Sequence, residues 1–129
     1  MMNLTLNLHQ EELSIVRLSP QNGLLAWLDL AAPPLVSVTF APNEVSIVCL
    51  TNLVPPGHRC EGPWRAFEIQ GPIDFALTGV LASVLNPLAM AGLSIFALST
   101  YDTDWILVRS EKLAAAQAAL AVHFQLREV

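Results

Sequence analysis

In the second half of the chain, apolar and polar positions alternate in four short runs. These runs predict strands at residues 64–69, 94–100, 105–109 and 122–126. Between the first two runs, residues 80–88 carry apolar side chains at the spacing of one helical face, and a second such stripe occupies residues 113–120. This half therefore predicts the order strand, helix, strand, strand, helix, strand.

Residues that favour helix ends flank both predicted helices. Thr78 is placed to cap the first helix, with Gly79 just inside it, and Gly92 is placed to end it. Pro87 lacks a backbone N–H and should kink the last turn. Ser110 is placed to cap the second helix.

The first half predicts two hairpins around a short helix. Alternation at residues 4–8 and an apolar run at 13–18 predict the first hairpin, and β-branched runs at 35–40 and 45–50 predict the second. Residues 24–31 are apolar enough for a short helix, which the following prolines would end. The two halves together predict an α+β fold of ferredoxin-like type, with two tandem βαββαβ units, antiparallel-rich sheets and helices on one face.

Residues 51–63 are rich in proline and glycine, so they are the expected boundary between the two predicted units. We expect an N-terminal unit at residues 1–57 and a C-terminal unit at 58–129, although an ordinary surface loop would have the same composition.

Composition and charge narrow the class of protein. Of the 129 residues, 53% are hydrophobic and 13% charged, and the mean hydropathy is +0.51. This is too apolar for a disordered chain, and it favours a homodimer that covers part of the apolar surface. The net charge is −5 and the six Lys and Arg residues are scattered, so we expect binding to neither nucleic acid nor anionic lipid.

Residues 75–98 carry no charge and are long enough to span a membrane. Polar and helix-breaking residues interrupt them, and their spacing changes from helical to extended near Gly92, so we expect a helix and a strand rather than a membrane span. The N-terminus has no signal-peptide pattern, and two cysteines without a CxxC motif do not form a disulfide scaffold. We therefore expect a cytoplasmic protein.

The polar run Ser99-Thr100-Tyr101-Asp102-Thr103-Asp104 lies at the tip of the hairpin predicted in the second half. It suits a tight turn, and its hydroxyls and carboxylates also suit a ligand. The sequence holds none of the common nucleophile, P-loop or dinucleotide-binding motifs, and residues 58–61 are too closely spaced for a zinc site. We expect no catalytic residue, metal or cofactor, although a small enzyme that uses His58, Asp102 or Asp104 is the remaining alternative.

The stretch Gly92–Val108, with the helix start near Ser110, resembles small bacterial tandem ACT-domain proteins. It is similar to the ACT modules of aspartate kinases and of animal cytosolic arginine sensors, and Gly71–Ala82 resembles the loop and helix start of the same family. The resemblance covers residues 64–122, and the first half corresponds to the divergent ACT-like unit of such proteins. It implies side-by-side pairing of units into a continuous sheet, a free amino acid held at the interface between units, and no catalysis.

The chemistry of an amino acid agrees with this implication. N–H groups at the start of a helix bind a carboxylate, and hydroxyls or a carboxylate bind an ammonium group. The predicted ligand-binding residues are Thr78, Gly79, Val80, Ser94, Ile95, Thr100, Thr103 and Asp104. We thus expect a regulatory or sensory protein that acts on an unidentified protein partner. The alternative is a dimeric scaffold that binds no ligand.

Overall fold

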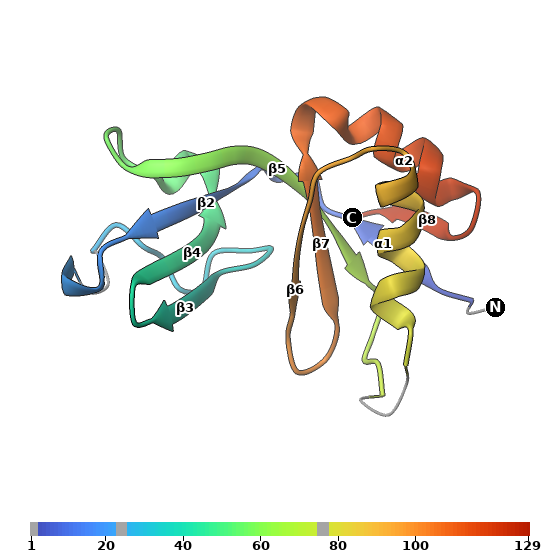
Figure 1. The fold of residues 1–129 in the computed structure, drawn as a ribbon, viewed down its shortest axis with the longest axis horizontal. Coiled ribbons are helices and arrows are strands. Elements are labelled where there is room, and N and C mark those ends of the chain that lie inside the picture. The colour runs from blue at the N-terminus through green and yellow to red at the C-terminus, as the bar shows by residue number, and fades with distance from the viewer. Residues whose placement is uncertain (1–2, 23–25, 75–77) are drawn as a thin grey trace. The chain divides into compact units, whose positions relative to one another are not determined.

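The computed structural model describes residues 3–22, 26–74 and 78–129 (Figure 1). The chain divides into two compact units: unit 1 is Met1–Gln10 with Arg65–Val129, and unit 2 is Glu11–Trp64. The long strand β5 (Arg59–Ile69) contributes its first half to unit 2 and its second half to unit 1. In space, the first strand therefore belongs with the second half of the chain. The division into ACT-like domains 1–57 and 58–129 stays a prediction.

Unit 1 is a mixed sheet with two helices. Its elements besides β5 are β1 (Thr5–Leu8), α1 (Val80–Met90), β6 (Ile95–Ser99), β7 (Asp104–Arg109), the 3-10 turn η3 (Ser110–Lys112), α2 (Leu113–Ala121) and β8 (Gln125–Glu128). β6 pairs with β7, β7 with β5, and β5 with β1, while β1 and β8 run parallel. The element order predicted for the second half of the sequence is confirmed.

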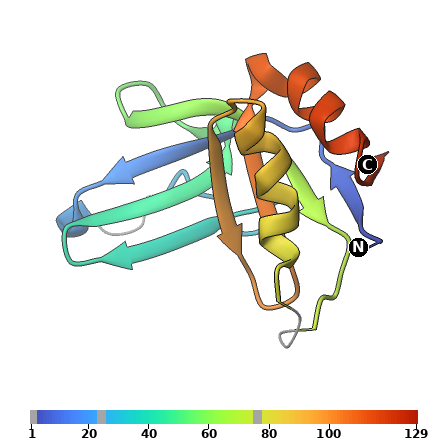
Figure 2. The same ribbon diagram turned by 45° about the vertical axis from the view of Figure 1, so that its right-hand side comes forward.

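The core of unit 1 lies between its sheet and both helices (Figure 2). The sheet contributes Leu6, Leu8, Phe67, Ile69, Ile106 and Val108, and the helices contribute Val80, Val84, Leu88, Ala116 and Leu120. Each fully buried Val, Leu, Ile or Phe side chain stabilises the fold by about 1.5–3 kcal/mol. Because both helices contribute to this one cluster, α1 and α2 cover the same face of the sheet.

The ends of α1 are set by two glycines. Gly79 is the N-cap, with φ 76° and ψ 2°, and no side chain caps the helix, so the prediction of Thr78 as N-cap is wrong. Gly79 takes the left-handed conformation in which the chain turns into the helix, which leaves Thr78 one residue outside it. At the other end the predicted stop at Gly92 is confirmed: it has φ 76°, and the Leu93 N–H donates to the Leu88 carbonyl at 3.1 Å.

The second helix begins later than predicted. Ser110 starts η3, and α2 follows at Leu113 with Lys112 as its N-cap. The predicted cap at Ser110 is wrong, because its hydroxyl is buried without a hydrogen-bond partner among the described residues instead of bonding to the helix start. The 3-10 turn separates this side chain from the first N–H groups of α2.

Unit 2 is an antiparallel sheet in the order β3-β4-β2-β5, without an α-helix among its described residues. It contains β2 (Leu13–Leu18), η1 (Pro20–Asn22), β3 (Ser37–Ala41), β4 (Glu44–Leu50) and η2 (Thr51–Leu53). The hairpin predicted from residues 35–40 and 45–50 is confirmed as β3 and β4.

Two predictions for the first half are wrong. β1 does not form a hairpin with β2; it pairs with β5 and β8, and the His9 N–H extends this pairing by donating to the Ala66 carbonyl at 3.0 Å. Residues 26–31 form turns rather than the end of a helix, because the Asp29 carboxylate accepts the Ala31 N–H at 3.0 Å. Residues 24 and 25 of that predicted helix lie outside the described residues.

The charge-free segment at residues 75–98 contains α1 followed by β6, as predicted, and its first three residues lie outside the described part. Over the ranges that the structure describes, no helix is long and apolar enough to cross a membrane.

Candidate functional site

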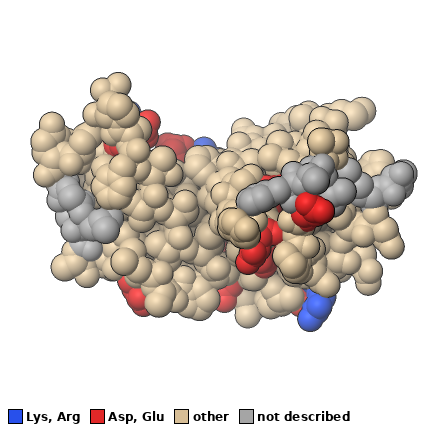
Figure 3. Space-filling view, turned by 90° about the horizontal axis from the view of Figure 1, so that it is seen from below, with Lys and Arg blue, Asp and Glu red and all other residues tan. Residues whose placement is uncertain are grey.

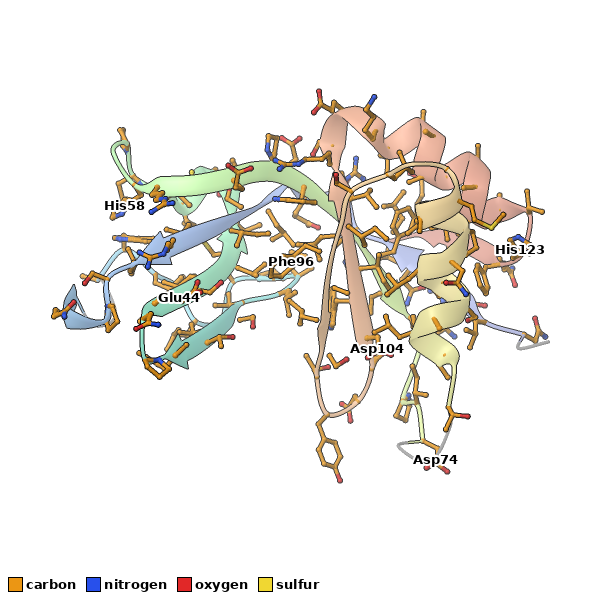
Figure 4. All side chains as sticks on the ribbon, viewed as in Figure 1. Glu44, His58, Asp74, Phe96, Asp104 and His123 are labelled. Carbon is orange, nitrogen blue, oxygen red and sulfur yellow. The ribbon has the colours of Figure 1, made fainter. Side chains whose placement is uncertain are left out.

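A pocket of about 270 Å³ lies in unit 1, between the start of α1 and the tip of the β6–β7 hairpin. Figure 4 labels Asp74 and Asp104 at this end of the unit. The lining residues are Ile73, Asp74, Gly79, Val80, Leu81, Ser99, Thr100, Tyr101, Asp102, Thr103 and Asp104. Two chain regions that are distant in sequence therefore meet here: the loop before α1 with the first turn of α1, and the hairpin tip.

Hydrogen bonds across the hairpin tip fix its shape. The Thr100 N–H and hydroxyl both donate to the Thr103 carbonyl, at 2.8 and 3.2 Å. Ser99 and Asp104 are directly opposite on the two strands, and the Ser99 hydroxyl donates to Asp104 Oδ1 at 2.5 Å. The Asp104 carboxylate is thereby oriented at the edge of the pocket.

The loop before α1 is tied to the same tip. The Ile73 N–H donates to the Asp102 carbonyl at 2.8 Å, and the buried Thr103 hydroxyl donates to the Ile69 carbonyl at 2.5 Å. A Cβ at Gly71 would lie 3.0 Å from the Asp102 carbonyl oxygen, closer than side chains normally approach. A glycine at position 71 thus allows the loop to pack directly against the tip.

The first turn of α1 offers backbone donors to the pocket. The first N–H groups of a helix have no acceptor within the helix, and here the N-cap residue, Gly79, has no side chain to accept from them. No acidic residue lies in this turn to balance the positive end of the helix dipole. Gly79, Val80 and Leu81 line the pocket, so an anionic group there could accept hydrogen bonds from these N–H groups.

The side chains opposite the helix start are acidic. Asp74, Asp102 and Asp104 line the pocket, and no Lys, Arg or His is among the described residues that do so. Figure 3, which views the molecule from below, shows acidic residues gathered on this surface of unit 1. In the described part of the chain, no three His, Cys, Asp or Glu side chains are arranged to hold a metal ion.

The structure brings five of the eight predicted site residues to the pocket: Gly79, Val80, Thr100, Thr103 and Asp104. Thr78 is exposed and does not line it. Ser94 and Ile95 lie at the other end of β6, where Ser94 is exposed and Ile95 packs against the core. The ligand-binding roles of the eight residues stay predictions.

The sequence interpretation missed several lining residues. Ser99, Tyr101 and Asp102 belong to the polar run that marked the tip, so their position in that run could have identified them. Ile73 and Asp74 belong to Gly71–Ala82, whose resemblance to the loop and helix start of the ACT family could have identified them, and the hydrogen bond from Ile73 to Asp102 holds this loop at the pocket.

Each of the three histidines contacts another side chain. His9 lies 2.8 Å from the Glu68 carboxylate and stacks on Trp105 with ring centroids 5.3 Å apart. The His58 ring contacts Trp27 at 5.4 Å, and His123 contacts the neighbouring Phe124. None of the three lines the pocket.

Comparison with known proteins identifies the fold of this chain. Residues 59–121 match the family model of the ACT domain. The regulatory subunit of aspartate kinase from Thermus flavus is 14% identical, with a TM-score of 0.60 over 94% of this chain and 96% of that one. At this identity the likeness shows the fold alone. The ferredoxin-like ACT fold predicted from the sequence is confirmed, and the chain contains an ACT domain.

The family follows from a second solved structure, protein Atu0741 from Agobacterium tumefaciens. It is 35% identical to this chain, with a TM-score of 0.91 over 100% of this chain and 96% of that one. The chain belongs to the same family as Atu0741.

One relative of this chain is named for its function. The cytosolic arginine sensor for mTORC1 subunit 1 from Bos taurus is 37% identical over 75 residues. The match covers 54% of this chain but 23% of the sensor, so the chain spans less than a quarter of the length of this relative. The predicted resemblance to ACT modules of arginine sensors and aspartate kinases is confirmed, and both named proteins are regulatory.

Proposed function

We propose that this chain is a non-catalytic regulatory protein that binds a free amino acid in the pocket of unit 1. The observation that carries the proposal is the chemistry on the two sides of the pocket. The start of α1 presents uncapped N–H groups on one side, and the hairpin tip presents hydroxyls and carboxylates on the other. An α-amino acid carries the two complementary groups, a carboxylate and an ammonium.

In this proposal the ligand carboxylate accepts N–H groups at Val80 and Leu81. The ammonium donates to Asp104, which the Ser99 hydroxyl already orients at 2.5 Å, and to the Thr100 hydroxyl. The cavity of about 270 Å³ is slightly smaller than the roughly 300–1,000 Å³ typical of drug-sized ligands. Its size therefore suits a molecule as small as an amino acid.

The charges around the pocket favour an amino acid with a basic side chain. After Asp104 binds the α-ammonium group, Asp102 still contributes negative charge to the lining of the pocket. A second cationic group on the ligand would compensate for this charge, whereas the side chain of aspartate or glutamate would be repelled. The name of the bovine relative, an arginine sensor, agrees with this preference.

Ligand binding would regulate by adding a bridge between the start of α1 and the hairpin tip. A ligand held between the start of α1 and the hairpin tip stabilises the conformation in which both face each other, and a protein partner that senses this conformation would respond. The cytoplasmic location and the identity of that partner stay predictions.

The proposal is tested by thermal unfolding of the full chain in the presence of each of the twenty amino acids. At 100 times its dissociation constant a ligand adds about 2.7 kcal/mol of stability, or about 10 °C in the midpoint for a chain of this size. We expect lysine, arginine or a related cationic amino acid to give the largest increase.

Asp104→Asn should abolish the increase while keeping an acceptor for the Ser99 hydroxyl. Glu111→Gln is the matched control, because Glu111 is exposed in unit 1 away from the pocket. If only neutral or acidic amino acids stabilise the protein, the charge preference is wrong and amino-acid binding stands. If none does, the proposal fails and the scaffold alternative takes its place.

A further inference from the structure

Part of the pocket in unit 1 is lined by apolar residues. Ile73, Val80 and Leu81 line it together with the hydroxyls and carboxylates of the hairpin tip. Val80 belongs to the buried core of unit 1, and the half-buried Ile73 and Leu81 pack against that core. The three residues therefore form an apolar wall of the pocket that is continuous with the core.

The contacts of the proposed function leave this apolar wall uncovered. They use the start of α1 for the ligand carboxylate, and Asp104 with Thr100 for the α-ammonium group. A ligand without a side chain, such as glycine, would leave the wall in contact with water. An aliphatic side chain would cover the wall, and each methylene group removed from water there stabilises the complex.

A carboxylate lies next to the apolar wall. The Ile73 N–H donates to the Asp102 carbonyl at 2.8 Å, so these two residues are direct neighbours. Asp102 lines the pocket and is exposed. A long side chain that covers Ile73 can therefore place a terminal cation near the Asp102 carboxylate while the cation stays in contact with water.

We propose that the apolar wall and Asp102 form a subsite for the side chain of the ligand, which selects amino acids with a long aliphatic side chain that ends in a cation. This inference rests on the proposed function, because the α-amino and carboxylate groups must be held at Asp104 and α1. It adds a separate requirement, the length of the side chain. Charge at the pocket favours every cationic amino acid, whereas burial of methylene groups favours the longer ones.

The test is a series of four diamino acids of increasing length: 2,3-diaminopropionate, 2,4-diaminobutyrate, ornithine and lysine. Their side chains carry one to four methylene groups before the terminal amine. Isothermal titration calorimetry with the full chain, at a pH below the pKa of every amine in the series, measures each dissociation constant at constant ligand charge. We expect binding to tighten by about fourfold with each methylene group that the wall covers.

Norleucine tests the terminal cation separately, because its side chain is that of lysine without the amine. Asp102 is exposed, so its ion pair with the lysine ammonium should be weak. Lysine should therefore bind about twofold to fivefold more tightly than norleucine. Asp102→Asn should remove this difference and leave the dependence on length unchanged.

Ile73→Ala tests the apolar wall. It should reduce the gain per methylene group and weaken the binding of lysine, while the binding of 2,3-diaminopropionate changes little. Ile95→Ala is the matched control, because Ile95 is also half-buried and packs against the same core but does not line the pocket. If Ile73→Ala does not fold, Ile73→Val removes a single methylene group and gives the same test with a smaller effect.

Two results would overturn this inference while the proposed function stands: affinities that are equal or fall with length across the series, or an equal loss of lysine affinity in Ile73→Ala and Ile95→Ala. In both cases an amino acid still binds. If none of the five ligands binds, the inference fails as well, and the thermal screen of all twenty amino acids decides whether the proposed function stands.

Discussion

The buried hydroxyl of Thr103 links the pocket wall to the sheet, and its removal should have a measurable cost. It donates to the Ile69 carbonyl at 2.5 Å, and Thr103 is 8% exposed. Thr103→Val keeps the shape of the side chain and deletes this donor. A net hydrogen bond is worth about 0.5–1.5 kcal/mol, and a buried acceptor left without a donor costs about 1–3 kcal/mol. We therefore expect a loss of about 1–3 kcal/mol in the free energy of unfolding.

Urea unfolding followed by circular dichroism measures this loss. With a slope of about 1–3 kcal/mol per molar urea, the midpoint should fall by about 1 M at an unchanged slope. Thr103→Ser is the control, because it keeps the hydroxyl and loses one methyl group, worth about 0.8 kcal/mol. Because the proposed ligand contacts are made by Asp104, Thr100 and the start of α1, the Val variant should still bind the ligand. Unchanged stability together with lost ligand binding would refute the reasoning and assign the hydroxyl to the ligand.

Two further predictions concern local packing and pH. Gly71→Ala places a Cβ 3.0 Å from the Asp102 carbonyl oxygen, so it should lower the stability by about 1–3 kcal/mol in the same urea assay, and an unchanged midpoint would contradict the packing described. Burial, with a smaller contribution from Cys60, raises the pKa of the Cys49 thiol from 9.0 to about 11. Because the pKa of this thiol is higher in the folded than in the unfolded state, the contribution of Cys49 to the free energy of unfolding is fully present below pH 9 and is lost as the pH rises toward 11. Cys49→Ala should therefore flatten the alkaline pH dependence of stability. An identical alkaline profile in that variant would contradict this prediction.

Local patterns in the sequence were sufficient to predict α1 and the hairpin that follows it. The apolar stripe fixes which face of α1 is buried, and Gly92 supplies the left-handed residue that ends it. The polar tip of the hairpin was recognisable because a tight turn and its two strands are adjacent in sequence.

Features that depend on distant segments could not be predicted in this way. The pairing of β1 with β5 and β8 leaves no local mark, since an alternating strand pairs equally well with any suitable neighbour. Ser94 was predicted to bind the ligand because its hydroxyl suits an ammonium group, but β6 separates it from the tip by roughly 17 Å at about 3.3 Å per residue. Asp74 lies at the pocket next to Ile73, whose N–H donates to the Asp102 carbonyl at the hairpin tip.

The most direct test of the proposed function is to locate the ligand by amide NMR. The ¹⁵N-labelled chain is titrated with the amino acid that raises its thermal midpoint most. We predict that the amide signals of Val80 and Leu81 and of residues 99–104 shift together along one binding curve, because these groups surround the pocket. Saturable shifts confined to other residues, or no shifts at saturating ligand, would contradict the account.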